Sequence, residues 1–431
     1  MGVVGATLGA LRRHGWPALA RMSAREAAAY ALAIAYMLKA RLWTLGRGAP
    51  RWKRVQAAWV QSEKDSTLCD TLAGRLSPSD VPRLVASGEE AFALRETLYR
   101  QAERSVDIAT YYLQSDDTGC ATIRALAECA ARGVRVRLLV DRFMTSRKSV
   151  EIEGMDALLA GARAAAIAVK AWHDPNRPYD SNHRKMIVVD GRTAVVGGRN
   201  FADHYRGDAW RDVDLVLEGP SVAPLAEMFD LVWNGAESGS DSAHPAPPWM
   251  DYVPADIESD PMMRAVLSAV GSARRTVDLE LAYFVAHEAL CAALERAIAR
   301  GVRVRLLTNS AESNDLPFAT WTTYEGARRV LEAGGSVHVR RGAGRTLHCK
   351  YVVVDNDWLS FGSHNLDYYS SRYCCEMNLI VRDLRLGALL TGIFETGLTQ
   401  ATPLSLEGEV RPFLTGNPAL RAFDRVFRDF Q

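Results

Sequence analysis

The chain has 431 residues, of which 48% are hydrophobic and 24% are charged, and its formal net charge is +1 at pH 7. These proportions are those of an ordinary globular protein with room for two or three domains, and they exclude a disordered or fibrous chain. The charge is unevenly spread, since residues 1–60 carry +9 and the remainder carries −8. Because an acidic body is a poor electrostatic match for nucleic acid, we expect no nucleic-acid partner.

Residues 1–88 are expected to form a basic, helical N-terminal region. Its longest apolar run, 27–38, has twelve residues, half of them alanine, whereas a membrane-spanning helix needs about 20 predominantly apolar residues. No secretory signal is evident, because Arg12 and Arg13 follow the first apolar residues instead of preceding them. A basic amphipathic helix fits two roles: it attaches to an anionic membrane surface, or it packs on the rest of the protein. The sequence leaves both open.

The next part of the chain alternates strands with helices. Residues 106–108 have the alternation of a half-buried strand, and 121–132 have helical spacing that ends at Gly133. Residues 134–140 then form another strand, with arginines on its alternate face. This order predicts an α/β domain with a mainly parallel or mixed sheet flanked by helices.

A motif follows these elements. His183, Lys185 and Asp190 form an H-x-K-x4-D pattern, and Asn200 lies 17 residues beyond the histidine in a Gly-Gly-Arg-Asn run. The apolar residues after the lysine predict a strand. His and Lys, two residues apart, therefore point to the same face.

A linker is expected between the two halves of the chain. Gly and Ser are frequent in residues 235–242, and the segment 244–249 contains three prolines. We place a first domain at 89–243 and a second at 251–431.

The same elements recur after this linker. The heptapeptide at 133–139 is repeated without change at 301–307, and strand-helix-strand patterns return at 277–281, 289–300 and 302–308. Such a duplication predicts two related domains in tandem. The second motif consists of His348, Lys350, Asp355 and, again 17 residues beyond the histidine, Asn365.

On these residues the chain resembles the phospholipase D superfamily, and within it the bacterial cardiolipin synthases. The resemblance covers roughly residues 88–400. It rests on the runs NHRKMIVVDGRTAVVGGRNFADHY (182–205) and LHCKYVVVDNDWLSFGSHNLDYYS (347–370). It implies two phospholipase-D-like domains related by a pseudo-two-fold axis, with the motifs facing each other. No metal or cofactor is expected, since no cluster of residues has convincing metal-ligand spacing.

Transfer of a phosphodiester needs a nucleophile, a proton for the leaving oxygen and positive charge around the other oxygens. One motif histidine would attack phosphorus to give a phosphohistidine, and the other would protonate the leaving alkoxide. The resemblance favours His183 as nucleophile and His348 as acid, which the nearly symmetric sequence does not decide. The lysines would neutralise the phosphate oxygens and the asparagines would donate hydrogen bonds to them. The predicted catalytic residues are His183, Lys185, Asp190, His348, Lys350 and Asp355, and the predicted phosphate-binding residues are Lys185, Lys350, Asn200 and Asn365.

The motif aspartates are expected to organise turns instead of transferring protons. A separate carboxylate is expected to hold each histidine ring and favour its protonated form. Glu376, 28 residues after His348, stands at the position that the resemblance implies for this role. Asp212 is its counterpart, because residues 212–217 align with 376–381, and Asp214 is the fallback. The alternative for both carboxylates is a surface salt bridge.

Seven cysteines, at 69, 120, 129, 291, 349, 374 and 375, show no C-x2-C pairing. An odd number without such a framework favours a reducing compartment and mostly buried, inert thiols. Cys349 lies between His348 and Lys350 and is expected to point away from them along a strand.

The predicted function is that of a cardiolipin-synthase-like phosphatidyltransferase, which moves a phosphatidyl group through a phosphohistidine to an alcohol acceptor such as phosphatidylglycerol. The sequence leaves open a phospholipase D that hydrolyses phospholipids to phosphatidic acid, a phosphodiester nuclease, and a lipid-binding protein without activity. The expected partners are phospholipid substrates and an anionic membrane surface, with no obligate protein partner. The expected location is the cytoplasmic face of a bacterial inner membrane, peripherally attached.

Overall fold

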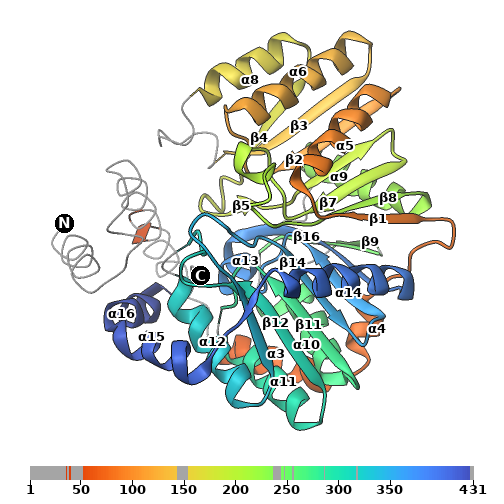
Figure 1. The fold of residues 1–431 in the computed structure, drawn as a ribbon. Coiled ribbons are helices and arrows are strands. Elements are labelled where there is room, and N and C mark those ends of the chain that lie inside the picture. The colour runs from red at the N-terminus through yellow and green to blue at the C-terminus, as the bar shows by residue number, and fades with distance from the viewer. Residues whose placement is uncertain are drawn as a thin grey trace.

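The computed structural model describes residues 52–142, 154–235, 244–246, 248–254, 257–285, 287–316 and 319–427, together with Ala35, Leu38 and Lys39. Two helix-flanked sheets make up this part of the chain, one for each half of the sequence (Figure 1). Most of the apolar run 27–38 lies outside the described residues, so its role stays a prediction. No helix among the described residues combines the length and the apolar character needed to cross a bilayer.

The first sheet is mixed. In order across the sheet it contains β1 (Val81–Val85), β8 (Asp214–Glu218), β7 (Thr193–Gly197), β6 (Met186–Val189), β2 (Ser105–Thr110), β3 (Arg135–Asp141) and β4 (Ala168–Trp172). The last three are parallel, whereas β6, β7, β8 and β1 pair antiparallel. Its helices are α5 (Gly88–Gln101), α6 (Asp117–Ala131), α8 (Met155–Ala164) and α9 (Ala223–Asn234).

The second sheet repeats this order and extends it at both edges. Its strands are β17 (Thr402–Pro403), β13 (Ser336–Arg340), β12 (Arg303–Asn309), β11 (Thr276–Leu281), β14 (Lys350–Val354), β15 (Trp358–Gly362), β16 (Cys374–Arg382), β10 (Trp249–Tyr252) and β9 (His244–Ala246). A short strand of the first half, β5 (Ser181–Asn182), pairs parallel with β16. Its main helices are α10 (Pro261–Ser272), α11 (Glu288–Ala299), α12 (Thr320–Glu332) and α14 (Leu384–Thr399).

Shorter helical segments complete the fold. They are α13 (Tyr368–Tyr373), α15 (Arg411–Gly416), α16 (Pro418–Phe427), the 3₁₀ turns η3 (Asp203–Tyr205), η4 (Pro220–Val222) and η5 (Ile257–Ser259), and the π-helical turn η7 (Leu406–Val410).

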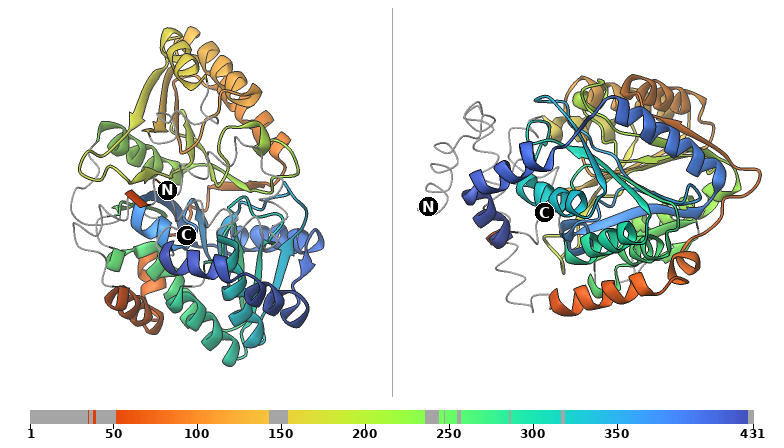
Figure 2. Two further views of the ribbon diagram at one scale, coloured as in Figure 1. Left: turned by 90° about the vertical axis from the view of Figure 1, so that its left-hand side faces the viewer. Right: turned by 60° about the horizontal axis from the view of Figure 1, so that its bottom comes forward.

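Alternation along the motif strands divides the apolar core into layers. On β6, Ile187 and Val189 face the cluster beneath α5, α6 and α8, while Met186 and Val188 face a central cluster. The central cluster also contains β14 and β16 side chains, so both halves contribute to one core. The inner helices reach across as well: α9 contacts β9 and β10, and α14 contacts β1. The helices that cover the other face of each sheet, away from the central cluster, lie at the two ends of the molecule (Figure 2).

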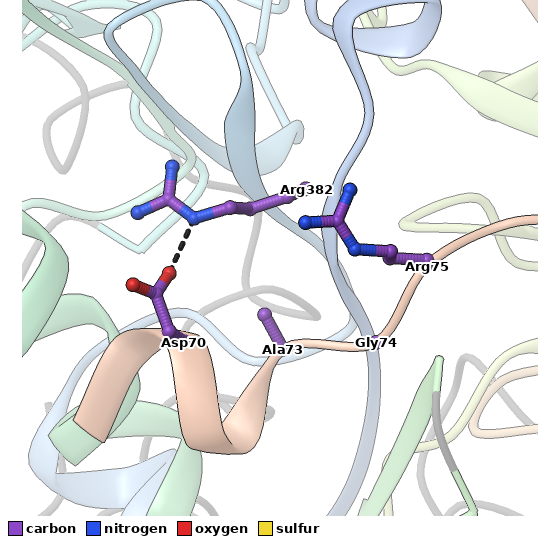
Figure 3. A pocket seen from close by; sticks show the side chains of 5 residues that line it. All are labelled: Asp70, Ala73, Gly74, Arg75 and Arg382. Atoms are coloured by element: carbon purple, nitrogen blue, oxygen red, sulfur yellow. Dashed lines mark hydrogen bonds and ion pairs between the residues drawn. The ribbon is translucent and has the colours of Figure 1, made fainter. Parts of the chain in front are cut away.

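The start of the described chain is attached to the second half. Helices α3 (Trp52–Lys64) and α4 (Leu68–Leu72) pack on α10, with Trp59 fully buried. The Gly74 N–H donates to the Ile380 carbonyl oxygen at 2.8 Å, and Arg382 forms an ion pair with Asp70. Figure 3 shows this pair beside a pocket that Arg75 also lines.

Two features differ from the sequence expectations. Within the segment 244–249, expected as a linker, residues 244–246 form β9 and Trp249 begins β10, and Pro245 is tolerated because β9 is an edge strand. β1 joins the first sheet although it precedes residue 89. The exact domain limits stay a prediction.

Candidate active site

Each motif begins two or three residues before its strand, β6 or β14, at the junction of the two halves. The backbone N–H of His183 donates to the Cys375 carbonyl oxygen at 2.9 Å, and that of His348 donates to the Arg211 carbonyl oxygen at 2.7 Å. Each histidine is thus tied to a strand or loop of the other half. Gly198 of the first motif is equally close, since a Cβ there would meet the His348 carbonyl oxygen at 2.8 Å.

The two histidine rings are held by carboxylates of the opposite half. Nδ1 of His183 lies 3.0 Å from both carboxylate oxygens of Glu376, and Nδ1 of His348 lies 2.8 Å from Oδ2 of Asp212. Both carboxylates are fully buried. A carboxylate on Nδ1 fixes the tautomer in which Nε2 carries the free lone pair. Asp214, the fallback, instead binds Arg95 at 2.9 Å.

The carboxylates are themselves fixed. Ser363 donates its hydroxyl to Oε2 of Glu376 at 2.5 Å, and the backbone N–H of Val213 donates to Oδ1 of Asp212 at 2.9 Å. Because the groups that hold the rings are rigid, the ring orientations are set before any substrate binds.

The motif lysines occupy equivalent places. Nζ of Lys185 donates to the His183 carbonyl oxygen at 2.7 Å, and Nζ of Lys350 donates to that of His348 at 2.6 Å. Both side chains are buried, and Lys185 also lies 5.3 Å from the ring centroid of Tyr111. Two lysine amino groups beside two imidazoles make a basic centre suited to an anion.

The two motif asparagines differ in their contacts. Asn200 donates to the Tyr205 hydroxyl at 2.7 Å and accepts from the Tyr112 N–H at 3.2 Å, which leaves one amide hydrogen for a phosphate oxygen. Oδ1 of Asn365 is buried without a hydrogen bond among the described residues. Their phosphate-binding role stays a prediction.

The structure does not bring Asp190 and Asp355 to the histidines. Each follows the far end of its motif strand, seven residues from the histidine, or roughly 20 Å along extended chain. Asp190 accepts the N–H groups of Glu103, Arg104 and Ser105 at 2.7–3.0 Å, and Asp355 accepts the three equivalent ones of residues 274–276. These aspartates therefore fix the starts of β2 and β11, as organisers of turns and not as reacting groups.

Burial sets the electrostatics of the centre. It lowers the pKa of His183 to about 4 against the attraction of Glu376, and it lowers the pKa of Lys185 to about 7. The pKa values of His348 and Lys350 are lowered by burial as well, and for His348 the two lysines add to the effect. Burial alone would raise the pKa of Glu376, but the charge and hydrogen bond of His183 hold it at about 2. The cations are destabilised until an anion joins them.

Two buried ion pairs join the halves next to the motifs. Nε of Arg211 donates to Oε1 of Glu280 at 2.6 Å, and Nη2 of Arg184 donates to Oδ2 of Asp251 at 2.8 Å. Arg211 precedes the orienting Asp212, and Arg184 follows His183. Sequence patterns gave no signal for either pair, because the partners lie 69 and 67 residues apart.

Aromatic side chains surround both imidazoles. The ring centroid of Tyr111 lies 4.9 Å from that of His183, and those of Tyr205 and Trp210 lie 5.5 and 5.7 Å from that of His348. Trp210 was not singled out from the sequence, although its place two residues before Asp212 is a usable signal.

One group of side chains in the described residues has the composition of a metal site. Ligand atoms of His183, Cys374 and Glu376 all lie within 4.8 Å of one another, and all three residues are buried. Residue spacing in the sequence does not reveal this group, because His183 and Glu376 are 193 residues apart. Cys349 instead points into the central apolar cluster.

Comparison with known families matches both halves. The model of the family described as "Cardiolipin synthase, PLD-like domain" matches residues 96–233 and again residues 266–397. Each match contains one complete motif and the carboxylate that holds the histidine of the other.

Individual relatives agree with this match. Cardiolipin synthase A of Pseudomonas fluorescens is 31% identical over 75% of this chain and 70% of its own length. The major cardiolipin synthase ClsA of Bacillus subtilis is 26% identical over the same shares. The crystal structure of phosphatidylserine synthase from Haemophilus influenzae aligns with a TM-score of 0.64 at 15% identity, covering 81% of this chain and 95% of that one, which shows a shared fold.

Proposed function

The chain belongs to the phospholipase-D-like family of the cardiolipin synthases, and from that premise we propose that it transfers a phosphatidyl group to an alcohol acceptor through a phosphohistidine. It is an enzyme of phospholipid metabolism, and the acceptor we propose is phosphatidylglycerol. The observation that carries the proposal is that the ring of each histidine contacts a carboxylate of the other half.

In the first step, Nε2 of His183 attacks phosphorus while Glu376 holds the proton on Nδ1. The bond from phosphorus to the leaving glycerol oxygen breaks, and His348 supplies the proton to that oxygen. Glu376 stays ionised, with a pKa of about 2, whereas burial raises the pKa of Asp212. The firmer negative charge behind His183 supports its assignment as nucleophile.

In the second step, His348 takes the proton from the acceptor hydroxyl, whose oxygen attacks phosphorus and releases His183. A proton must be present on His348 at the start, although burial and the lysines lower its pKa in the empty site. The negative charge of a bound phosphodiester opposes those two effects and raises the pKa. Substrate binding thus favours protonation of His348, the proposed general acid.

We also propose that the enzyme works at the surface of an anionic membrane, on its cytoplasmic side. The support is the +9 charge of residues 1–60 together with the lipid nature of the substrates. Sedimentation with vesicles should show binding to anionic lipid that weakens as salt is raised. Equal binding to zwitterionic vesicles would contradict the electrostatic attachment.

The test of the activity is incubation of the purified full chain with phosphatidylglycerol vesicles, with products identified by mass spectrometry. Cardiolipin and free glycerol are expected, and an acid-labile phosphatidyl group on His183 should be trapped early in the reaction. Phosphatidic acid as the main product would instead establish hydrolysis. Absence of every product would reject the proposed activity.

A further inference from the structure

Strand pairing brings a thiol to the nucleophile. On β16, Cys374 and Glu376 are two residues apart and therefore lie on the same face, while Cys375 lies on the other face in the central apolar cluster. β5 pairs with β16 in the register Ser181 to Cys374, which sets His183 beside Glu376. The thiol, the carboxylate and the imidazole converge from two strands of different halves.

The three ligand atoms are of types that Zn²⁺ binds, and their separations are close to those that it requires. Zinc binds Cys sulfur, His nitrogen and carboxylate oxygen at about 2.0–2.3 Å, so tetrahedral ligands lie roughly 3.3–3.8 Å apart. The 3.0 Å between His183 Nδ1 and Glu376, and the 4.8 Å limit for the whole group, need only small side-chain shifts. A thiolate and a carboxylate together balance the charge of the ion, which offsets repulsion from nearby Lys185.

We propose that His183, Cys374 and Glu376 bind Zn²⁺, and that the bound ion inhibits the enzyme. The inhibitory part rests on the proposed function, with His183 as the nucleophile. Binding releases the thiol proton of Cys374 to solvent and moves the ring proton of His183 from Nδ1 to Nε2. Nε2 then has no lone pair with which to attack phosphorus. Zinc thus takes the place of the proton that Glu376 holds on the ring.

The surroundings of His348 lack the equivalent site. The residue two places before Asp212 is Trp210, which stands where Cys374 stands relative to Glu376, and an indole offers no ligand to zinc. The described residues contain no other group of this kind. Zinc therefore acts on one histidine of the pair, and one ion per chain is expected.

The experiment uses the full chain after treatment with a chelator, in three forms: unchanged, Cys374→Ala and the matched control Cys375→Ala. Zn²⁺ is titrated by calorimetry, and Co²⁺ is used as a spectroscopic probe for a thiolate-to-metal charge-transfer band. We expect one Zn²⁺ per chain and a charge-transfer band for the unchanged protein and for Cys375→Ala. Loss of one direct ligand in Cys374→Ala should weaken binding by roughly 100-fold or more. Mg²⁺, which prefers oxygen ligands, should bind to none of them at this site.

Inhibition is measured against the zinc-free rate of each protein. The zinc concentration for half inhibition should rise in Cys374→Ala in proportion to the loss of affinity, and Cys374→Ser should behave likewise. Equal zinc affinity in Cys374→Ala and Cys375→Ala, or no charge-transfer band, would overturn the site. Binding without inhibition would overturn the inhibitory role. A chain that binds zinc but shows no phosphatidyl transfer under chelation contradicts the proposed function and leaves the binding result standing.

Discussion

The two histidine sites have the same backbone arrangement and differ in the side chains around them. In both sites the backbone N–H of the histidine donates to a carbonyl oxygen of the other half, and Nδ1 of its ring contacts a carboxylate. Nζ of the motif lysine donates to the carbonyl oxygen of the histidine. The residues around His183, however, are Glu376, Ser363 and Cys374, whereas those around His348 are Asp212 and Trp210. The two histidines and two lysines thus occupy equivalent positions while the side chains around them differ, which agrees with our proposal that the two histidines take different roles.

Removal of the histidines tests that difference in roles most severely. Both His183→Ala and His348→Ala should lower transfer by at least about 10⁴-fold, since each removes a reacting group. With a nitrophenyl phosphodiester, whose leaving group needs no proton, His348→Ala should still form phosphoenzyme and His183→Ala should not. Rapid quenching followed by detection of phosphohistidine measures this. The reverse pattern would exchange the two roles.

Neutral replacements of Glu376 and Asp212 compare the contributions of the two carboxylates that contact the histidine rings. Glu376→Gln and Asp212→Asn keep the shape of the side chain but remove the charge that fixes the ring tautomer, and each should lower kcat by about 10²–10⁴-fold. The loss in phosphoenzyme formation should be larger for Glu376→Gln, because it lies behind the proposed nucleophile. Single-turnover kinetics resolve that step. Equal losses in the step would remove the argument for asymmetry.

Replacement of the motif aspartates separates structure from chemistry. Asp190→Ala and Asp355→Ala each lose a side chain that accepts three backbone N–H groups, and each should lower the free energy of unfolding by about 1–3 kcal/mol. Once folded, the variants should keep kcat within about tenfold of the unchanged enzyme, because the groups lie far from the histidines. Denaturant unfolding and steady-state kinetics are measured side by side. A 10⁴-fold fall in kcat with unchanged stability would return the aspartates to the reacting set.

Anion binding tests the shared basic centre and has the smallest expected effect. At pH 7, Lys185, with a pKa of about 7, is only partly protonated, and His348 is largely neutral. A bound anion raises both pKa values, so protons move onto the protein. Sulfate, which exchanges no proton at this pH, should bind with uptake of up to about one proton.

Calorimetry of sulfate binding in two buffers of different ionisation enthalpy measures this uptake, and Lys185→Met should reduce it. Heats that do not depend on the buffer would mean that the centre is already fully charged.

Local patterns in the sequence predicted much of this arrangement. The alignment of residues 212–217 with 376–381 singled out the two carboxylates that lie against the rings. The repeated H-x-K spacing predicted histidine and lysine on one face of a strand, but both histidines precede their strands, which begin at Met186 and Lys350. Such patterns report neighbours along one strand or helix. They could not show that β5 pairs with β16, which is what brings Cys374 to His183.

The same limit explains two features of the fold that local patterns did not specify. The proline-containing segment 244–249 has the composition of a loop, yet residues 244–246 complete the edge of the second sheet as β9. That pairing depends on β10 and, through it, on β16, more than 100 residues away. Each motif strand forms an antiparallel hairpin with the next strand, β6 with β7 and β14 with β15, and is also antiparallel to the strand on its other side, β2 or β11. Helix–strand alternation in the earlier part of each repeat revealed only the parallel portion.

The central apolar cluster has a consequence for how the catalytic cycle ends. Because side chains of both sheets interlock in that cluster, the spacing of the two imidazoles is fixed by close packing and not by a hinge. Opening the molecule along this seam would expose the whole layer to water. If the products are lipids, as proposed, we expect them to depart sideways past Tyr111, Tyr205 and Trp210, the aromatic side chains around the imidazoles. Changes at Tyr111 or Trp210 should then alter turnover through release.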